Sequence, residues 1–318
     1  MGEKRNSCKN KKIVFMGTPE IATYALNALL EKSFDVVAVV CQPDKPIGRK
    51  KEIIFSSVKK LAIEKNIKFF QPNKIKEIEN ELKELNPFAF VTCAFGQFIP
   101  DSILSIPEFG CINIHASLLP KYRGGAPIHW AVINGEKETG VCLMRTIKQM
   151  DAGDVYCSRK VNIEESDTTS TLFKKMNNLV YDIVLNDLEK VFNLEYPPIK
   201  QDESKVSFAY NISKDDEKIN FEKNAVEIVN LIRGLSETPG AYCFINDKKM
   251  KLFKAVSTNS KSNNAPGTIN NISKEGILIS TKDFDILVKE VQIEGKNRQE
   301  VKNILNGNSE IKIGVTLK

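Results

Sequence analysis

The sequence predicts an α/β protein in which a Rossmann-like, mostly parallel sheet is followed by a small β-barrel domain. In the first half, short apolar runs alternate with helix-patterned segments of about ten residues. Those runs are continuously apolar, which is typical of strands buried on both faces of a sheet. In the second half, short strand-like runs are separated by turn residues, as in small all-β domains. The length of 318 residues allows about two domains of ~150 residues each.

The first half alternates regularly between the two patterns. Apolar runs predict strands at residues 12–16, 35–41, 67–70, 88–93 and 111–115. Helical spacing predicts helices at residues 20–31, 57–65 and 76–85, and a long amphipathic helix at 168–193. The turn Gly17-Thr18-Pro19-Glu20 starts the first helix, since Pro suits a first helical position. It lacks the G-x-G-x-x-G spacing of a dinucleotide site.

The second half begins after a change in composition. The run EYPPIKQDESKV carries two prolines and mixed charge, which indicates a linker. A short helix at 225–234 precedes strands at 240–245, 250–255, 276–280, 285–292 and 311–317. This pattern favours a small barrel of the oligonucleotide-binding (OB-like) type. We therefore predict a catalytic domain at 1–194 with a flexible tail at 1–10, a linker at 195–208 and a C-terminal β-barrel at 209–318.

Composition narrows the class of protein. The polar first ten residues lack the apolar core of a signal peptide, and the apolar runs are too short to span a membrane. Seven cysteines, an odd number with no C-x-x-C pair, indicate reduced core thiols in a cytoplasmic protein. With only two histidines we expect no metal. The net charge of +6 permits an RNA partner without demonstrating one.

Asn113 and His115 are the strongest candidates for chemistry. They are two residues apart in a predicted strand, so they point to the same side. Asp151 follows in the loop MDAGD, with Asp154 as a competing carboxylate. An amide donor, an imidazole and a carboxylate can move a proton and stabilise an oxyanion, as acyl transfer requires. From the residues alone, Asn113 could equally bridge main-chain groups at a strand end, and a lone histidine is more often structural.

Longer motifs carry a family resemblance over nearly the whole chain beyond the polar tail. The first half contains IVFMGTPE, QPDKPIGRKK, FGQFIP and CINIHASLLPKYRGGAPIHW, followed by MDAGD. The second half contains NLIRGLSETPGAYCFINDKKMKLFKA, APGT and EVQIEGKNRQEVKNILNG. The chain resembles the methionyl-tRNA formyltransferase family, within the wider group of 10-formyltetrahydrofolate-dependent formyltransferases. The first-half motifs belong to the wider group, and the second-half motifs are more specific to the tRNA enzymes.

The resemblance implies transfer of a formyl group from 10-formyltetrahydrofolate to the α-amine of methionine on initiator tRNA, in translation initiation. It implies the catalytic residues Asn113, His115 and Asp151. It implies folate contacts at SLLP, which is Ser117, Leu118, Leu119 and Pro120. It implies a tRNA-engaging loop at 43–51 with Lys45, Arg49, Lys50 and Lys51. The chain departs from the family pattern at Glu52, where a lysine is common. We expect a monomer with no membrane partner.

Roles for these residues follow from the reaction. Attack by the amine on the formyl carbon gives a tetrahedral intermediate, and Asn113 is the expected donor to its oxyanion. We expect His115 to help move a proton to the leaving nitrogen, and Asp151 to hold the ring in one tautomer. The turn Arg123-Gly124-Gly125 is expected to be a flexible surface loop, or one that closes over substrate.

Two alternatives remain open at this point. The first is a formyltransferase with the same catalytic domain that acts on a sugar-nucleotide amine or a purine precursor. The second is a noncatalytic RNA-binding protein with a degenerate transferase domain. The segments RGLSETPGAY and APGT favour tRNA over the first, and the intact Asn, His and Asp set argues against the second.

Overall fold

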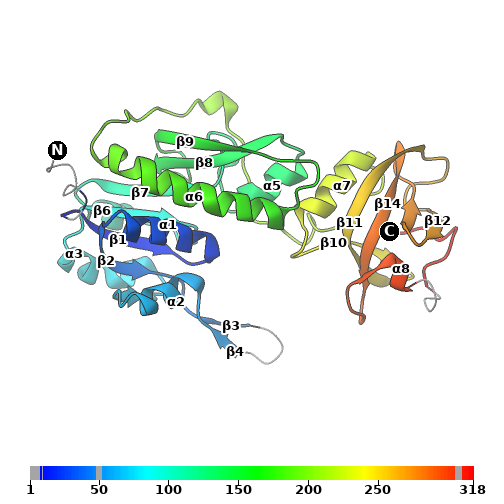
Figure 1. The fold of residues 1–318 in the computed structure, drawn as a ribbon, viewed down its shortest axis with the longest axis horizontal. Coiled ribbons are helices and arrows are strands. Elements are labelled where there is room, and N and C mark those ends of the chain that lie inside the picture. The colour runs from blue at the N-terminus through cyan, green and yellow to red at the C-terminus, as the bar shows by residue number, and fades with distance from the viewer. Residues whose placement is uncertain (1–7, 9, 48–51, 305–309) are drawn as a thin grey trace. The chain divides into compact units, whose positions relative to one another are not determined.

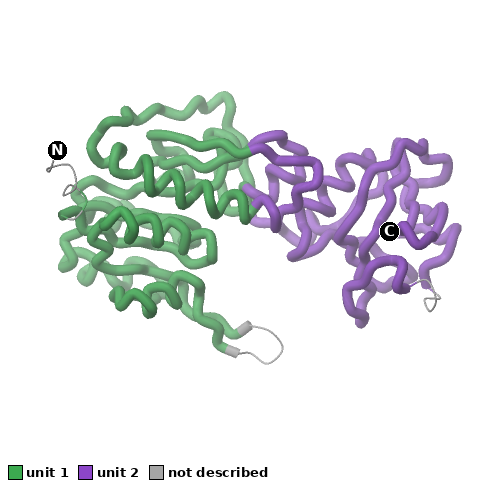
Figure 2. The backbone as a smooth tube through the Cα atoms, in the orientation of Figure 1, with its two compact units in different colours: residues 1–127, 139–161, 173–210 green, residues 128–138, 162–172, 211–318 purple. Residues whose placement is uncertain are grey.

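The computed structural model of the chain describes residues 8, 10–47, 52–304 and 310–318. It divides into two compact units, coloured separately in Figure 2. Unit 1 comprises residues 1–127, 139–161 and 173–210, and unit 2 comprises residues 128–138, 162–172 and 211–318.

Unit 1 is built on a seven-stranded sheet with the order β5-β2-β1-β6-β7-β8-β9 (Figure 1). The strands are β1 (Lys12–Gly17), β2 (Asp35–Val40), β5 (Phe69–Phe70), β6 (Ala89–Cys93), β7 (Gly110–His115), β8 (Glu138–Arg145) and β9 (Val155–Asn162). β1 pairs in parallel with β2 and with β6, and β6 with β7, whereas β7 and β8 are antiparallel. The predicted mostly parallel sheet is confirmed. Strands β8 and β9 were not predicted.

Helices cover both faces of this sheet. They are α1 (Glu20–Glu31), α2 (Ser57–Glu64), α3 (Glu79–Glu84), α4 (Asp101–Leu104) and α6 (Thr169–Phe192), with a 3-10 turn at Ile75–Ile78; α5 (Pro127–Ile133) belongs to unit 2 except for its first residue. Val14, Met16 and Phe90 pack on one face against residues of α3 and α4. Because side chains alternate along a strand, Ile13 and Phe15 face the other side. There α1 and α6 lie side by side, linked by an ion pair from Lys32 to Glu189 (Figure 1).

A small hairpin follows β2, formed by β3 (Lys45–Ile47) and β4 (Glu52–Ile54). Strand β3 lies within the segment 43–51 that is expected to engage tRNA, and β4 follows that segment directly. Lys45 is exposed on β3. Arg49, Lys50 and Lys51 lie outside the described residues.

Unit 2 contains an antiparallel sheet with the order β10-β11-β14-β13-β12, with β15 paired to β14. Its elements are α7 (Ala225–Gly234), β10 (Ala241–Ile245), β11 (Lys248–Lys261), β12 (Ile269–Ser273), β13 (Gly276–Ile279), β14 (Phe284–Ile293), β15 (Gln299–Glu300) and α8 (Val301–Ile304). The buried face of α7 packs into the core of this sheet through Ile228 and Ile232. The predicted small β domain with one preceding helix is confirmed.

One predicted strand of unit 2 is wrong. Residues 311–317 form no strand, and Thr316 makes only an isolated bridge to Thr268. Gly314, with φ of +85°, interrupts extended backbone there. The apolar residues in this stretch are still anchored, because Ile311 and Leu317 are buried in the unit 2 core.

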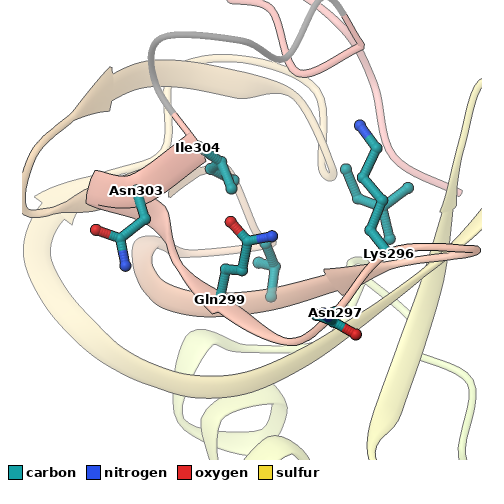
Figure 3. A pocket seen from close by; sticks show the side chains of 7 residues that line it. Lys296, Asn297, Gln299, Asn303 and Ile304 are labelled. Atoms are coloured by element: carbon teal, nitrogen blue, oxygen red, sulfur yellow. The ribbon is translucent and has the colours of Figure 1, made fainter.

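A shallow pocket of about 200 Å³ opens on unit 2 beside β14 and β15. Figure 3 shows its polar lining, which includes Lys296, Asn297, Gln299 and Asn303. These residues belong to unit 2, whereas Asn113, His115 and Asp151 belong to unit 1. We assign this pocket no part in the chemistry. Within the described residues, no helix is long and apolar enough to cross a membrane.

Candidate active site

The three predicted catalytic residues meet in unit 1. Asn113 and His115 lie at the carboxyl end of β7, and Asp151 comes from the loop after β8. The Nδ2 atom of Asn113 lies 3.4 Å from Oδ1 of Asp151. The Nδ1 atom of His115 lies 3.6 Å from Oδ2 of Asp151. The carboxylate therefore lies between the amide and the imidazole, and its side chain keeps 18% of its surface exposed.

Thr92 sets the orientation of the Asn113 amide. Thr92 is the penultimate residue of β6 and pairs with Asn113 across the parallel ladder. Its hydroxyl donates a hydrogen bond of 2.8 Å to Oδ1 of Asn113. The amide nitrogen must then face Asp151, and an amide NH₂ group has a second hydrogen to donate. Asn113 is thus presented as a hydrogen-bond donor.

The tautomer of His115 is set by the main chain. The Nε2 atom lies 2.9 Å from the carbonyl oxygen of Tyr122. Because a carbonyl only accepts, Nε2 carries the hydrogen and Nδ1 is left as the basic nitrogen. Nδ1 is the atom that faces Asp151. The sequence reasoning expected Asp151 to fix the tautomer, whereas this geometry gives that task to Tyr122 and leaves Asp151 beside the protonatable nitrogen.

Two glycines allow the chain to approach the carboxylate closely. The main-chain N–H of Gly124 donates a hydrogen bond of 2.8 Å to Oδ2 of Asp151. Gly124 has φ of +127°, and a Cβ atom there would lie 2.6 Å from the carbonyl oxygen of Ala209. A Cβ atom at Gly153 would lie 1.8 Å from the carbonyl oxygen of Arg145. Asp151 itself has φ of +48°, a conformation that non-glycine residues adopt rarely.

Arg123 is buried, with 1% of its surface exposed, so the expected flexible surface turn is wrong. Its guanidinium donates to Oε1 of Gln201 from Nε at 3.1 Å and from Nη2 at 2.9 Å. It also donates to both carboxylate oxygens of Glu203. Gln201 in turn donates from Nε2 to the main-chain oxygens of Asp151 and Gly153. Sequence reasoning missed Gln201, because it lies in a run whose composition indicated a linker.

The SLLP segment leaves β7 directly and so lies at the same end of the sheet as the candidate site. Ser117 is fully buried, and its hydroxyl donates a hydrogen bond of 2.7 Å to the carbonyl of Lys121. Leu118, Leu119 and Pro120 are half-buried. Asp154 supplies the competing carboxylate. Its main-chain carbonyl accepts a hydrogen bond from the main-chain N–H of Arg145.

Cys93 and Cys111, in the strands that lead to the site, are poor nucleophiles. Burial raises the pKa of Cys93 and of Cys111 to about 12, so both stay protonated near neutral pH. No cluster of three metal-ligating side chains occurs among the described residues. The groups that the site offers for chemistry are therefore an amide, an imidazole and a carboxylate.

The amino-acid sequence matches the models of a known protein family. Residues 11–187 match the family model described as formyl transferase, and residues 211–309 match that of the formyl transferase C-terminal domain. This chain belongs to the formyl transferase family. The match to the C-terminal domain extends the family assignment to unit 2.

Curated relatives cover almost all of the chain. A methionyl-tRNA formyltransferase from Mycoplasma mycoides is 47% identical over 307 residues, which are 95% of this chain and 97% of the relative. A methionyl-tRNA formyltransferase from Caldanaerobacter subterraneus is 43% identical over 96% of this chain and 100% of the relative. The similarity thus includes both units.

Solved structures share the fold. The methionyl-tRNA formyltransferase from Clostridium thermocellum superposes with a TM-score of 0.55 at 16% identity, covering 89% of this chain and 98% of that one. A sugar 3N-formyl transferase, solved in the presence of dTDP and 5-N-formyl-tetrahydrofolate, gives a TM-score of 0.67 at 25% identity. It covers 90% of this chain and 99% of that one. A folate-derived formyl donor is therefore consistent with the family.

Proposed function

We propose that this chain transfers the formyl group of 10-formyltetrahydrofolate to the α-amino group of methionyl initiator tRNA, giving N-formylmethionyl-tRNA. The observation that carries the proposal is the match to methionyl-tRNA formyltransferases over both units, at 47% identity and 95% coverage of this chain. The meeting of an amide donor, an imidazole and a carboxylate at one end of the sheet supports it chemically.

Asn113 acts on the formyl oxygen. When the amine adds to the formyl carbon, that oxygen becomes negatively charged. The Thr92 hydroxyl holds the Asn113 amide with its nitrogen toward Asp151, so the second N–H of that amide is in place before the charge develops. A fixed donor of this kind contributes roughly 10²–10³ in rate.

His115 and Asp151 handle protons. The attacking amine must lose a proton and the leaving nitrogen must gain one. In the neutral ring the Nδ1 atom of His115 is free of hydrogen, because Nε2 donates to Tyr122. Nδ1 can therefore take up a proton, and Asp151, 3.6 Å away, then stabilises the cation. The amine is itself the nucleophile, so no acyl-enzyme step is needed.

The remaining roles extend over the whole chain. We assign the chemistry to residues 1–194 and tRNA binding to the domain at 209–318, joined by the segment 195–208. Ser117, Leu118, Leu119 and Pro120 would line the folate site. Lys45, Arg49, Lys50 and Lys51 would contact the tRNA near its acceptor end, where clustered cations suit phosphate. The enzyme would act as a monomer in the cytoplasm, where translation begins.

The test is a formyl-transfer assay with 10-formyltetrahydrofolate and charged initiator tRNA, run beside the His115→Ala variant. We expect transfer to the methionyl amine by the wild type and its loss in the variant. Folate turnover with a sugar-nucleotide amine but not with tRNA would favour the sugar-amine reaction and contradict our proposal. Folate binding without turnover of any amine would favour a noncatalytic protein.

A further inference from the structure

We propose that Arg123 and Gln201, here named the Arg123–Gln201 clamp, are positioning residues that hold Asp151 against His115. The inference rests on the proposed function for its kinetic consequences, although its structural consequence can be measured without substrate. Neither residue touches the reacting atoms. Both act through two loops. One loop carries Tyr122, whose carbonyl contacts His115, and the other carries Asp151.

The first loop of this arrangement is 122–124. The carbonyl of Tyr122 accepts from His115, and the N–H of Gly124 donates to Asp151. Arg123 lies between these two contacts along the chain. Its buried guanidinium is therefore an anchor for the very peptide groups that fix the ring and the carboxylate.

The second loop is 151–153. Asp151 has φ of +48°, and a non-glycine residue in that region is strained and persists only where its surroundings hold it there. The Nε2 group of Gln201 donates at 2.8 Å to the carbonyl of Asp151 and at 2.7 Å to that of Gly153. These two hydrogen bonds are the direct hold on the strained turn.

The Gln201 amide joins the two loops because all its polar atoms are engaged. Oε1 accepts twice from Arg123, and both Nε2 hydrogens go to the second loop. The amide cannot flip, since a flip would place its oxygen against two carbonyls and its NH₂ group against the guanidinium. Gln201 is 7% exposed, so water cannot easily replace these bonds.

Main-chain pairing keeps the clamp in place. Arg123 donates to the carbonyl of Ser207 at 2.9 Å, and its own carbonyl accepts from Ala209 at 2.7 Å. On the other side, Ile199 exchanges two main-chain hydrogen bonds with Val155. The segment 199–209 is thus tied to β9 at one end and to the 122–124 loop at the other.

The Gln201→Glu variant separates positioning from folding. A carboxylate at this position still accepts hydrogen bonds from Arg123, so the buried guanidinium keeps its partner. It has no hydrogens for the carbonyls of Asp151 and Gly153, and its charge repels them. The variant therefore removes the hold on the strained loop while keeping the rest of the clamp.

We expect Gln201→Glu to lower kcat roughly 100-fold, with KM for tRNA and for folate nearly unchanged. The matched control is Asn186→Asp on the exposed face of α6, where the amide nitrogen also donates to a main-chain carbonyl, that of Asp182. Its kcat should stay within about twofold of wild type. A Gln201→Glu enzyme with wild-type kcat, or one impaired only in KM, would overturn the proposal.

The second readout is nitrogen NMR of the imidazole rings, which is simple because the chain has only two histidines. We expect wild-type His115 to carry its hydrogen on Nε2, and Gln201→Glu to shift its signals while those of His129 stay fixed. Unchanged His115 signals in a variant with reduced kcat would refute positioning through the loops. If Gln201→Glu does not fold, Gln201→Asn replaces it, since the shorter amide cannot reach both loops and should give the same two effects. Wild-type protein without any transfer activity would reject the proposed function, whereas the NMR comparison would still test the clamp.

Discussion

The Nε2 atom of His115 donates to the main-chain carbonyl of Tyr122, 2.9 Å away, and this contact decides which ring nitrogen can exchange protons. A main-chain acceptor cannot be lost by substitution of its own side chain. The ring therefore depends on the position of the 122–124 loop more than on the chemistry of any one side chain.

Replacing Thr92 by Val should lower kcat about three- to tenfold, the value of one neutral hydrogen bond. Val keeps the shape of Thr92 but cannot donate to Oδ1 of Asn113, so the amide is free to turn. The measurement is steady-state kinetics of formyl transfer. The same change made in an Asn113→Ala background should cost nothing further, because its effect passes through the amide. Additive losses would contradict this route.

Replacing Gly124 by Ala should destabilise unit 1 and reduce activity together. The residue has φ of +127°, and an added Cβ atom would lie 2.6 Å from the carbonyl oxygen of Ala209. Gly314→Ala is the control, since Gly314 also has positive φ, +85°, but nothing within 4 Å. In denaturant titrations we expect the control to lose about 1 kcal/mol, from backbone strain alone. Equal losses for the two variants would show that contact with Ala209 is unimportant.

Thiol reagents should leave the candidate site unmodified. Burial raises the pKa of Cys93 and Cys111 to about 12, so at pH 8 only about one thiol in ten thousand is ionised. Treatment of native protein with iodoacetamide, followed by mass spectrometry, should find both unlabelled and the transfer activity retained. Protein unfolded in urea should label at all seven cysteines. Labelling of Cys93 with loss of activity in native protein would contradict this expectation.

Asp283 should make the stability of unit 2 depend on pH. Desolvation opposes its ionisation, but hydrogen bonds from the N–H groups of Ala225 and Phe284 and from the Thr281 hydroxyl outweigh it and lower its pKa. A pKa that is lower in the folded state favours the fold above the unfolded-state pKa, and this contribution is lost as pH falls through the folded-state pKa.

The Asp283→Asn variant tests that sign. Asn can still accept a hydrogen bond but never ionises, so wild type should be more stable than the variant near pH 7. The difference should shrink as the pH falls below about 4, where the unfolded carboxyl is protonated. Chemical denaturation at several pH values measures it. A stability difference that grows toward low pH would mean that folding raises the pKa of Asp283, and would contradict this prediction.

The strand period was enough to place Asn113 and His115 on one side of β7, because both lie within a continuous buried run. Asp151 was different, since its loop has no period and the assignment needed the family motif. The strand β9 was missed because it lies at an edge of the sheet and alternates between buried and exposed residues. Its sequence therefore contains no long continuous apolar run. Local pattern thus predicted most of the strands that are buried on both faces, although the equally buried β8 was missed as well.

The clamp could not be predicted from local pattern. Gln201 lies in a stretch of prolines and charges, and it acquires a role only because the chain returns to pair with residues 123 and 155. Arg123 looked like a mobile surface cation for the same reason. Burial of the guanidinium depends on partners that are 78 and 80 residues away in sequence. A local stretch of sequence around Arg123 therefore does not include them.

The order of synthesis gives this return of the chain a further meaning. Gln201 is synthesised 50 residues after Asp151, so a nascent chain already holds Asn113, His115 and Asp151 before the Gln201 hydrogen bonds can form. A fragment cut at residue 187 or 194 would be in the same condition permanently. If the clamp positions Asp151 as proposed, the site is complete only after the segment 199–209 has been made, which ties the onset of activity to synthesis of the segment that leads into unit 2.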